Sequence, residues 1–340
     1  MRFPFLAIFA LSFAAATAHA QNSVPVTLDN FALAESDLYF GNALKDAGGI
    51  GKFFHNRTPV ELDKQAVIRM NRDTLYSGAV FDLDAGPATI TLPNTGRRLM
   101  SLEVISEDHY APTVVYAPAK ITLRKASVGT RYAMAAVRTL ADPNSPDDLK
   151  EVATLQDAIK VSQPGGPGKF EVPNWNTQQQ KEIRDALLLL GKYSSAFDNA
   201  MGPRGKVDPI RHLIVTAAGW GANPDKDARY ASVMPEKNDG TTVYKLTVPA
   251  NVPVDGFWSI TLYNGDGYLQ KNDYNAYSIN NITAKKNADG SVAVQFGGCD
   301  GKIPNCLPTM NGWNYLVRLY RPRDAILEGK WKFPEAKPAS

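Results

Sequence analysis

The chain has 340 residues with 37 basic and 34 acidic side chains, and its formal net charge is +3. It carries no basic tail or stripe, so nucleic acid and anionic membranes are poor candidates for partners. The length is enough for two modest domains or one large β domain, and the composition is that of an ordinary globular protein.

Residues 1–20 have the features of a secretory signal. Arg2 supplies a positive start, the apolar run after it is too short to span a bilayer comfortably, and Ala18-His19-Ala20 is an A-x-A cleavage site. A buried N-terminal helix is the alternative, but that helix would have no polar face. We therefore predict a periplasmic or secreted protein, cleaved after Ala20, with no transmembrane segment.

The first part of the chain reads as a helix followed by strands. Residues 30–47 have apolar side chains at helical spacing and end at Gly48-Gly49. Short runs with a period of two follow, separated by Pro, Gly and Asn, at 87–93, 97–106, 113–126 and 131–140. This pattern is typical of a β-sandwich and predicts an N-terminal β domain over residues 21–141.

Helical patterns dominate the middle of the chain. Ser145 is a good N-cap with Pro146 at the first helical position, and amphipathic patterns follow at 177–201 and 207–221. We predict a helical connector over residues 142–222.

A second strand-rich region begins near Tyr230. Residues 244–248, 257–263, 287–296 and 314–322 carry alternating apolar side chains or a turn followed by them. In 257–263 the alternation puts Trp258, Ile260 and Leu262 on one face of the strand. We predict a C-terminal β domain over residues 223–340.

The two cysteines, Cys299 and Cys306, are seven positions apart in a Gly/Pro-rich loop. In an oxidising compartment such a pair is expected to form a disulfide. Closing so small a ring stabilises the fold by roughly 2.5 kcal/mol, so the bond would hold a loop in place and not a domain.

Several long blocks resemble known bacterial families. "MNRDTLYSGAVFDLDAGPATITLP" is similar to the domain of unknown function (DUF) 1254, and "VPANVPVDGFWSITLYNGDGYLQKNDYNAYSI" with "NADGSVAVQFGG" and "LVRLYRP" is similar to DUF 1214. The resemblance implies a mainly β protein: an immunoglobulin-like β-sandwich, a small helical insert and a jelly-roll-like β-sandwich. It implies no particular activity.

Standard catalytic motifs are absent from the sequence, and no cofactor or metal is predicted. Past the predicted cleavage site there are three histidines, His55, His109 and His212, which would have to converge from separate segments to bind a metal. In "SEDHY", His109 has carboxylates nearby, with Glu103 close in the sequence, and a carboxylate can raise the basicity of an imidazole. A polar loop at the end of a strand is the simpler interpretation of the same residues.

The stretch "NRDT" has two interpretations. Asn71 and Asp73 can form an Asx turn that leads into a strand starting at Leu75. Alternatively, Asp73 acts as a base and Tyr76 orients a polar ligand in a cleft. Under that alternative, the remaining ligand contacts come from the neighbouring polar side chains, Asn71, Arg72, Thr74 and Ser77.

The aromatic residues of the C-terminal region are also open to two interpretations. Trp258 and Tyr263 lie in a strand, where aromatic side chains usually pack in the core. The tyrosines, asparagines and aspartates that follow also resemble the lining of a sugar-binding face.

Three hypotheses about function follow. The first is an exported hydrolase of a small or polymeric polar substrate, with its site at the junction of the two β domains and with Asp73, Tyr76 and His109 as catalytic residues. The second is a non-catalytic binding module for carbohydrate or envelope components, and the third is a structural envelope protein. The fold does not choose among them, and the oligomeric state stays open, a homo-oligomer included.

Overall fold

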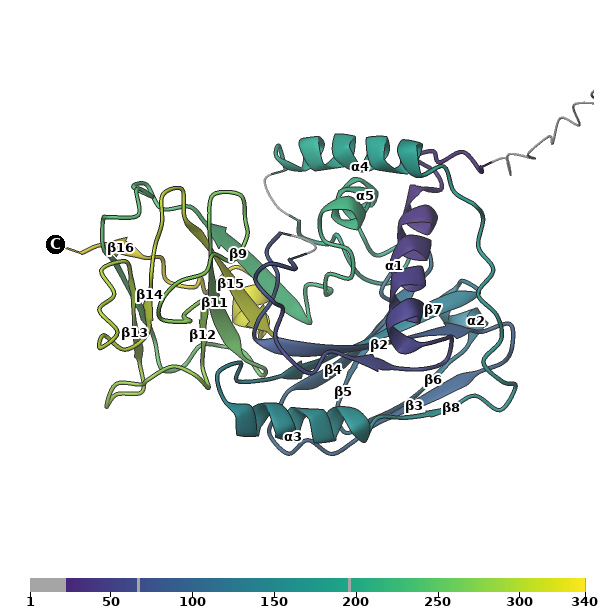
Figure 1. Ribbon diagram of the computed structural model, residues 1–340, viewed down its shortest axis with the longest axis horizontal. Coiled ribbons are helices and arrows are strands. Elements are labelled where there is room, and N and C mark those ends of the chain that lie inside the picture. Colours follow the sequence, from purple (N-terminus) through teal and green to yellow (C-terminus); the bar gives the residue numbers. More distant parts are fainter. Residues whose placement is uncertain (1–22, 66–67, 195–196, 340) are drawn as a thin grey trace, which may run out of the picture.

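The computed structural model of the protein describes residues 23–65, 68–194 and 197–339 (Figure 1). The predicted signal at 1–20 lies outside the described residues. The fold is strand-rich with several antiparallel sheets and a helical insert, as predicted, but it is mixed and not mainly β. The immunoglobulin-like and jelly-roll-like assignments, and the domain boundaries, stay predictions.

The predicted first helix is confirmed as α1 (Phe31–Ala47). It ends where Gly48 adopts a left-handed backbone conformation, with φ of 68°, and the Gly48 N–H donates to a carbonyl of the last turn. One face of α1 packs on a sheet through Phe40 and Ala43.

Two sheets share the N-terminal core. The five-stranded sheet has the order β1-β2-β7-β4-β5 and the three-stranded sheet the order β6-β3-β8. The strands are β1 (Phe54–His55), β2 (Thr74–Asp82), β3 (Ala88–Leu92), β4 (Met100–Ser106), β5 (Thr113–Tyr116), β6 (Ala119–Leu123), β7 (Tyr132–Leu140) and β8 (Lys160–Ser162). Apolar side chains of both sheets form one cluster that includes Phe81, Ile90 and Leu102.

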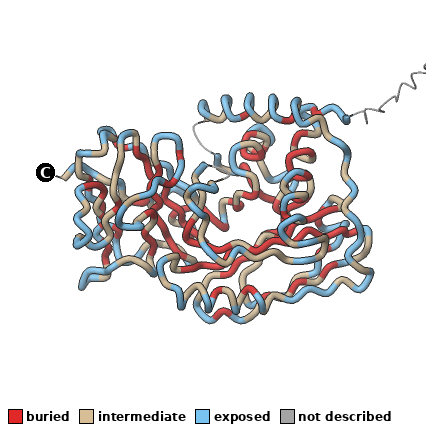
Figure 2. The backbone as a smooth tube through the Cα atoms, in the orientation of Figure 1, coloured by how far each residue is buried: buried red, intermediate tan, exposed pale blue. Residues whose placement is uncertain are grey.

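The five-stranded sheet is covered on both faces, because α1 packs on the face opposite the three-stranded sheet. The central strands β2 and β4 are therefore buried almost throughout, as the red segments in Figure 2 show. Polar side chains on these strands must find partners inside the molecule.

The helical insert contains α3 (Pro146–Asp157), α4 (Thr177–Gly191) and α5 (Pro209–Ala218). The side chain of Ser145 caps α3 by accepting from the Asp148 N–H, which confirms the predicted start. Helix α4 is shorter than the predicted 177–201, because Gly191 has a low helix propensity and the chain turns after it. Two further short helices are α2 (Lys125–Val128) and α6 (Asp324–Leu327).

The C-terminal region contains two four-stranded sheets, ordered β14-β13-β10-β16 and β12-β11-β15-β9. The strands are β9 (Ala228–Val233), β10 (Tyr244–Val248), β11 (Trp258–Tyr263), β12 (Ser278–Asn280), β13 (Val292–Phe296), β14 (Cys306–Leu307), β15 (Asn314–Tyr320) and β16 (Lys337–Pro338). Their apolar faces form one core, and a disulfide joins Cys299 and Cys306 as predicted.

Strand β11 positions the junction between the two strand-rich regions. Trp258, Ile260 and Leu262 face the C-terminal core, which confirms the predicted alternation. The polar residues on the other face are buried as well, because the segment that leads into β2 packs there. In Figure 1 the C-terminal sheets lie to the left of the N-terminal sheets, and α4 and α5 lie above the latter. Among the described residues, no helix is long and apolar enough to cross a membrane.

Candidate functional site

The "NRDT" stretch forms the Asx turn that one interpretation of the sequence predicts. The Oδ1 atom of Asn71 accepts from the Asp73 N–H at 2.9 Å. The Nδ2 atom of Asn71 donates to Thr74 Oγ1 and to the Tyr320 hydroxyl, each at 3.0 Å. The turn therefore starts β2 and also binds it to β15 of the C-terminal region.

Asp73 lies at this junction, with 0% of its surface exposed. Its Oδ1 atom accepts from Asn280 Nδ2 at 3.1 Å. Burial raises the pKa of Asp73, although nearby Arg318 and the hydroxyl of Ser259 act in the opposite direction. Asp73 therefore does not line the cleft that the catalytic interpretation of the sequence requires, because β11 and β12 cover its carboxyl group.

Arg72 and Ser77, two predicted ligand contacts, already have partners inside the protein. Arg72 is buried, donates to the Val60 carbonyl at 3.0 Å and lies over the ring of Tyr277 at 4.8 Å. Ser77 is hydrogen-bonded to Nδ1 of His55 at 2.8 Å. These side chains build the fold around the turn and do not line a cleft.

His109 lies under the helical insert, also with 0% of its surface exposed. Its Nε2 atom accepts from the Gly221 N–H at 2.8 Å, so the proton resides on Nδ1, which donates to Thr216 Oγ1 at 2.8 Å. Burial and the neighbouring His212 hold the pKa of His109 well below its usual value. Both ring nitrogens are thus committed within the fold.

The carboxylates near His109 in sequence bond other groups. Asp108 forms an ion pair with Arg204 and accepts from the Ser106 hydroxyl, and Glu107 accepts from the Tyr132 N–H. The predicted carboxylate support for the imidazole is therefore not formed.

Tyr76 and Glu103 meet at Arg138 of β7. The guanidinium of Arg138 donates to Glu103 Oε2 at 2.7 Å and lies 5.5 Å from the ring centroid of Tyr76. Burial would raise the pKa of Tyr76, but Arg138 and the amide of Asn71 outweigh it, and the pKa is lowered. Burial raises the pKa of Glu103 to about 7 in spite of Arg138.

Arg138 also connects two of the predicted catalytic residues indirectly. It donates to the Gly221 carbonyl, while the N–H of the same residue donates to His109. Tyr76 and His109 therefore lie on two sides of Arg138, Tyr76 through a ring contact and His109 through hydrogen bonds by way of Gly221, without touching each other.

The predicted aromatic sugar-binding face is not formed by Trp258 and Tyr263. Trp258 is 5% exposed and packs against Phe333 at a centroid distance of 5.8 Å. Tyr263 is fully buried, donates to the Met70 carbonyl at 2.8 Å and accepts from Arg318 at 2.8 Å. Both are packing residues, as the simpler interpretation of the sequence holds.

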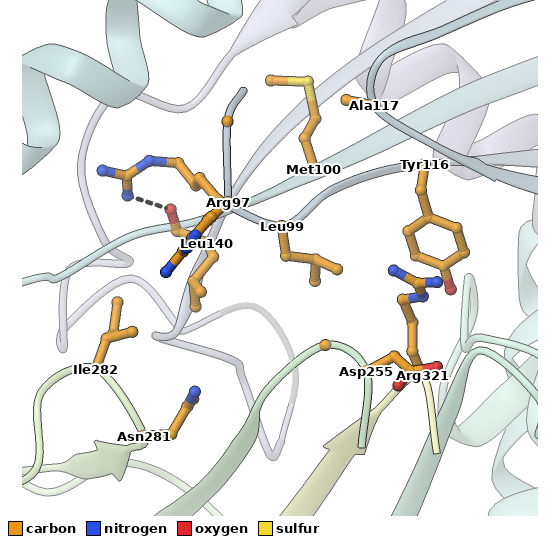
Figure 3. Close-up of a pocket in the computed structure, with 13 residues that line it drawn as sticks. Arg97, Leu99, Met100, Tyr116, Ala117, Leu140, Asp255, Asn281, Ile282 and Arg321 are labelled. Carbon is orange, nitrogen blue, oxygen red and sulfur yellow. Dashed lines mark hydrogen bonds between the residues drawn. The ribbon is translucent and has the colours of Figure 1, made fainter. Parts of the chain in front are cut away.

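A pocket of about 170 Å³ opens at the same junction, on residues that the sequence analysis did not identify (Figure 3). Its lining comes from three stretches of the N-terminal region and three of the C-terminal region: 96–100, 116–117, Leu140, 255–256, 281–282 and Arg321. In Figure 3 the ring of Tyr116 and the guanidinium of Arg321 lie together on one side, and Asn281 and Ile282 lie on the other.

Two of the three arginines in the pocket wall have no carboxylate partner among the described residues. Among the described residues, Arg97 and Arg321 take part in no ion pair, and Arg97 is exposed. The guanidinium of Arg321 lies 4.6 Å from the ring centroid of Tyr116. Asp255, also in the lining, is paired with Arg323 at 2.6 Å and with neither of these two arginines, while the charge of Arg321 acts on the carboxyl group of Asp227.

Two buried carboxyl groups, those of Asp227 and Glu103, lie behind the pocket wall. The Tyr116 hydroxyl donates to Asp227 Oδ1 at 2.7 Å, and Asp227 Oδ2 has no hydrogen-bond partner in the described part of the chain. Burial raises the pKa of Asp227, and the charge of Asp227 adds to the rise at Glu103. The pKa of Tyr116 is raised by burial and by Asp227, so Tyr116 stays protonated.

One feature of Arg321 distinguishes it from an ordinary strand-end residue. Its φ is 52°, a left-handed conformation that is uncommon for residues other than glycine, and its N–H donates to the Asp227 carbonyl at 2.9 Å. Such backbone conformations concentrate at binding sites. In the sequence, the only signal that could have identified Arg321 as a pocket residue is its place directly before Pro322, at the end of a predicted strand.

The histidines do not gather as a metal site would require. His55 is bonded to Ser77 of β2, whereas the rings of His109 and His212 lie 5.5 Å apart under the insert. Within the described ranges, no group of three or more His, Cys, Asp or Glu side chains is placed to hold a metal ion.

Two family profiles match the chain. The profile described as protein of unknown function (DUF1254) matches residues 50–117, and the profile described as protein of unknown function (DUF1214) matches residues 230–324. The resemblance seen in the sequence is thus confirmed, with DUF1254 in the N-terminal part and DUF1214 in the C-terminal part. Arg97 and Tyr116 lie in the first match, and Asn281 and Arg321 in the second, so the pocket lies where the two meet.

Two solved structures are similar to more than nine tenths of the chain. The VPA0106 protein from Vibrio parahaemolyticus is 18% identical with a TM-score of 0.70, over 92% of this chain and 98% of its own. A putative uncharacterized protein from Burkholderia cenocepacia is 14% identical with a TM-score of 0.51, over 91% of this chain and 86% of its own. At these identities the similarity shows the fold alone. No curated protein matches the sequence.

Proposed function

We propose that this chain, which combines a DUF1254 region with a DUF1214 region, is an exported protein that binds a small polar ligand with an anionic group. The ligand occupies the junction pocket of about 170 Å³. One observation supports this proposal most directly: Arg97 and Arg321 line the pocket and form no ion pair within the described residues. The junction of the two regions is also where the sequence analysis expects a site.

The chemistry of the wall favours an anion over a neutral sugar. A guanidinium binds carboxylate or phosphate oxygens through paired N–H groups, and it does so most strongly where water is partly excluded. Arg321 covers one face of the Tyr116 ring, so that face is not available to stack on a sugar. The volume limits the bound group to a few non-hydrogen atoms, since pockets for drug-sized ligands span about 300–1,000 Å³.

Anion binding tests this proposal directly. We expect isothermal titration of the wild-type protein with acetate and inorganic phosphate to show saturable binding of at least one of them. Arg321→Met should weaken it by about 10- to 100-fold, because a charge-assisted hydrogen bond contributes about 1.5–3 kcal/mol.

The matched control is Arg124→Met, since Arg124 is an exposed arginine outside the pocket lining that takes part in no ion pair among the described residues. It should bind like the wild type. The proposal is refuted if the wild-type protein binds neither anion. It is also refuted if the Arg321→Met and Arg97→Met variants bind as tightly as the wild type.

A second candidate function is hydrolysis, which the carboxyl pair behind the wall favours. Asp227 and Glu103 both have raised pKa values, and Glu103, at about 7, titrates in the range where a carboxyl group can serve as proton donor and acceptor. Tyr116 links Asp227 to the pocket and would carry the proton to a leaving group. Asp73 and His109 are sealed from the pocket, so their predicted catalytic roles receive less support than Tyr116.

A screen of esters, amides and glycosides separates the two candidates. If the protein is a hydrolase, Tyr116→Phe should abolish turnover while Asp73→Asn retains it. If the protein binds anions but turns over no class of substrate, only the binding function remains supported.

A further inference from the structure

Helix α4 presents an outward face that is open to solvent. The buried side chains of α4, Gln180 and Leu187, pack against α1 and α5. Leu189 follows Leu187 by two positions, which turns its side chain to the opposite side of the helix, and it is 55% exposed. Figure 1 shows α4 along the upper margin of the molecule, with α1 and α5 below it, and in Figure 2 much of α4 is pale blue.

Large apolar side chains gather at the end of this face. Past Gly191 the chain continues in a tight turn, in which the Tyr193 N–H donates to the Leu190 carbonyl at 3.0 Å. A Cβ atom at Gly191 would lie 4.0 Å from the ring of Phe197, so Phe197 lies beside the same turn. All four apolar residues of this surface are exposed, and Tyr193 is 83% exposed: Leu189, Leu190, Tyr193 and Phe197. An apolar surface of this kind is typical of an interaction site.

The charged side chains of the outward face fit a second copy of the same helix. Asp185, Leu189 and Lys192 follow the spacing i, i+4, i+7 and so share one side of α4. If two copies cross antiparallel with a two-fold axis at Leu189, Lys192 of one copy lies opposite position 186 of the other, next to Asp185. In a parallel pair, Lys192 would face Lys192 and Asp185 would face Asp185, and both contacts are repulsive. The charges therefore favour the antiparallel arrangement.

Both charged groups can accept such a partner. Lys192 is exposed and takes part in no ion pair within the described ranges. Asp185 pairs with Lys181 on its own helix through Oδ2 at 2.5 Å, and both side chains of that pair are more than half exposed. The Oδ1 atom of Asp185 has no bonded partner in the described part of the chain, so it can accept from Lys192 of the second copy.

The apolar side chains fit the same axis. Leu189 of one copy would meet Leu189 of the other there, and each would cover the exposed part of its counterpart. Tyr193 would lie opposite position 185 of the second copy, next to Ala186, whose small side chain leaves room for the ring. One register thus accommodates the apolar and the charged groups together, as an interface between identical surfaces requires.

We propose that α4 is the interface between two copies of this chain, packed antiparallel about a two-fold axis at Leu189. Helix α4 has 15 residues and is about 22 Å long, so the helix pair forms a small interface of the kind found in weak complexes. We expect a dissociation constant on the order of 10 µM. No residue of α4 lines the junction pocket, so the inference is independent of the proposed anion binding.

Sedimentation velocity of the purified protein, over a concentration series that spans this dissociation constant, is the primary test. We expect the wild type to pass from monomer to dimer as its concentration rises. Leu189→Glu should stay monomeric throughout, because it places two carboxylates at the axis. Val161→Glu, on exposed β8 far from α4, is the matched control and should dimerise like the wild type. A wild type that is monomeric throughout, or a Leu189→Glu variant that dimerises equally well, would overturn the inference.

A charge exchange tests the antiparallel register. Lys192→Glu and Asp185→Lys should each weaken dimerisation by about tenfold, because every dimer contains two such pairs and each change makes both repulsive. The double variant restores opposite charges and should dimerise like the wild type. Lys150→Glu, an exposed lysine on α3, is the control and should have no effect. If the single variants dimerise normally, or the double variant does not recover, the register is wrong and the inference fails.

Lipid vesicles test the other occupant that an exposed apolar face could have. Glu182 and Asp185 lie on the outward face and repel anionic headgroups, so we expect no binding to vesicles of phosphatidylcholine and phosphatidylglycerol. If the wild type sediments with these vesicles and Leu189→Glu does not, the face binds a lipid surface and the proposed dimer is refuted.

Discussion

The exposure and the pKa of Asp73 depend on the segments that cover its side chain. In the sequence it stands among hydroxyl groups at the start of a strand, a setting shared by turn residues and by catalytic acids. In the fold it is fully buried, with Asn280 as hydrogen-bond partner and Arg318 as the neighbouring positive charge. Burial is the largest influence on its pKa, so the ionised form is the costly one.

We predict that Asp73→Asn raises the free energy of unfolding at pH 8, on the order of 1–2 kcal/mol, because a neutral amide replaces a buried charge of the same shape. A group with a raised folded pKa contributes stability at low pH that is lost as the pH rises. The gain should therefore shrink as the pH falls towards 4, because a raised pKa leaves more of the wild-type carboxyl protonated there. Urea denaturation at both pH values measures it.

Asp266→Asn, in an exposed loop, is the control and should change stability little at either pH. A large loss of stability in Asp73→Asn at pH 8 would show that the charge itself is required.

At the scale of elements, helix α5 is attached to the five-stranded sheet through His109. The imidazole accepts from the N–H of Gly221, three residues after the last residue of the helix, and donates to Thr216 within it. His212 of α5 stacks on Tyr110 and bonds the Ala200 carbonyl, and its pKa is also lowered by burial. The charged groups facing this cluster are Arg204 and Asp108, which pair with each other.

Because the folded pKa of His109 lies below the usual value of 6.5, its contribution to stability is present at neutral pH and lost as the pH falls below about 6.5. We predict that hydrogen-exchange protection of α5 decreases between pH 7 and pH 5, by at most about 1.4 kcal/mol per pH unit for each histidine that takes up a proton. Mass spectrometry of the exchanged peptides reports this locally.

His109→Asn should flatten this dependence, and Asn also tolerates the left-handed backbone at this position, where φ is 67°. His55→Asn on β1 is the control and should leave α5 unaffected. An unchanged pH slope in His109→Asn would mean that His109 does not titrate in this range.

For the molecule as a whole, the junction couples the two strand-rich regions through buried polar groups. Arg318 of β15 donates to Thr261, to Tyr263 and to the Arg69 carbonyl at 2.7–2.8 Å. Asn280 and Asn71 add contacts across the same surface. Separating the regions would leave these groups without partners, which is unfavourable by about 1–3 kcal/mol for each.

We therefore predict one cooperative thermal transition in calorimetry for the wild-type protein. Arg318→Met should lower the free energy of unfolding by about 3 kcal/mol and separate the transition into two, because it leaves the buried acceptors unpaired. Arg323→Met, whose ion pair with Asp255 is on the surface, should keep a single transition. Two resolved transitions in the wild type would contradict the coupling.

The sequence by itself determined what depends on near neighbours in the chain. The capped start of α3 at Ser145, the Asx turn at Asn71, the alternation in β11 and the Cys299–Cys306 bond follow from local geometry over a few residues. The family resemblance extended this to a strand-rich fold with a helical insert.

Only the tertiary structure decided which polar groups are sealed and which face a hollow. Whether Asp73 meets water depends on β11 and β12, which lie about two hundred residues along the chain (187 from Asp73 to Ile260, 206 to Ile279). The pocket likewise brings together Arg97 and Arg321, which are 224 positions apart in the sequence. Burial and pocket shape are properties of packing between distant segments, and no local pattern carries them.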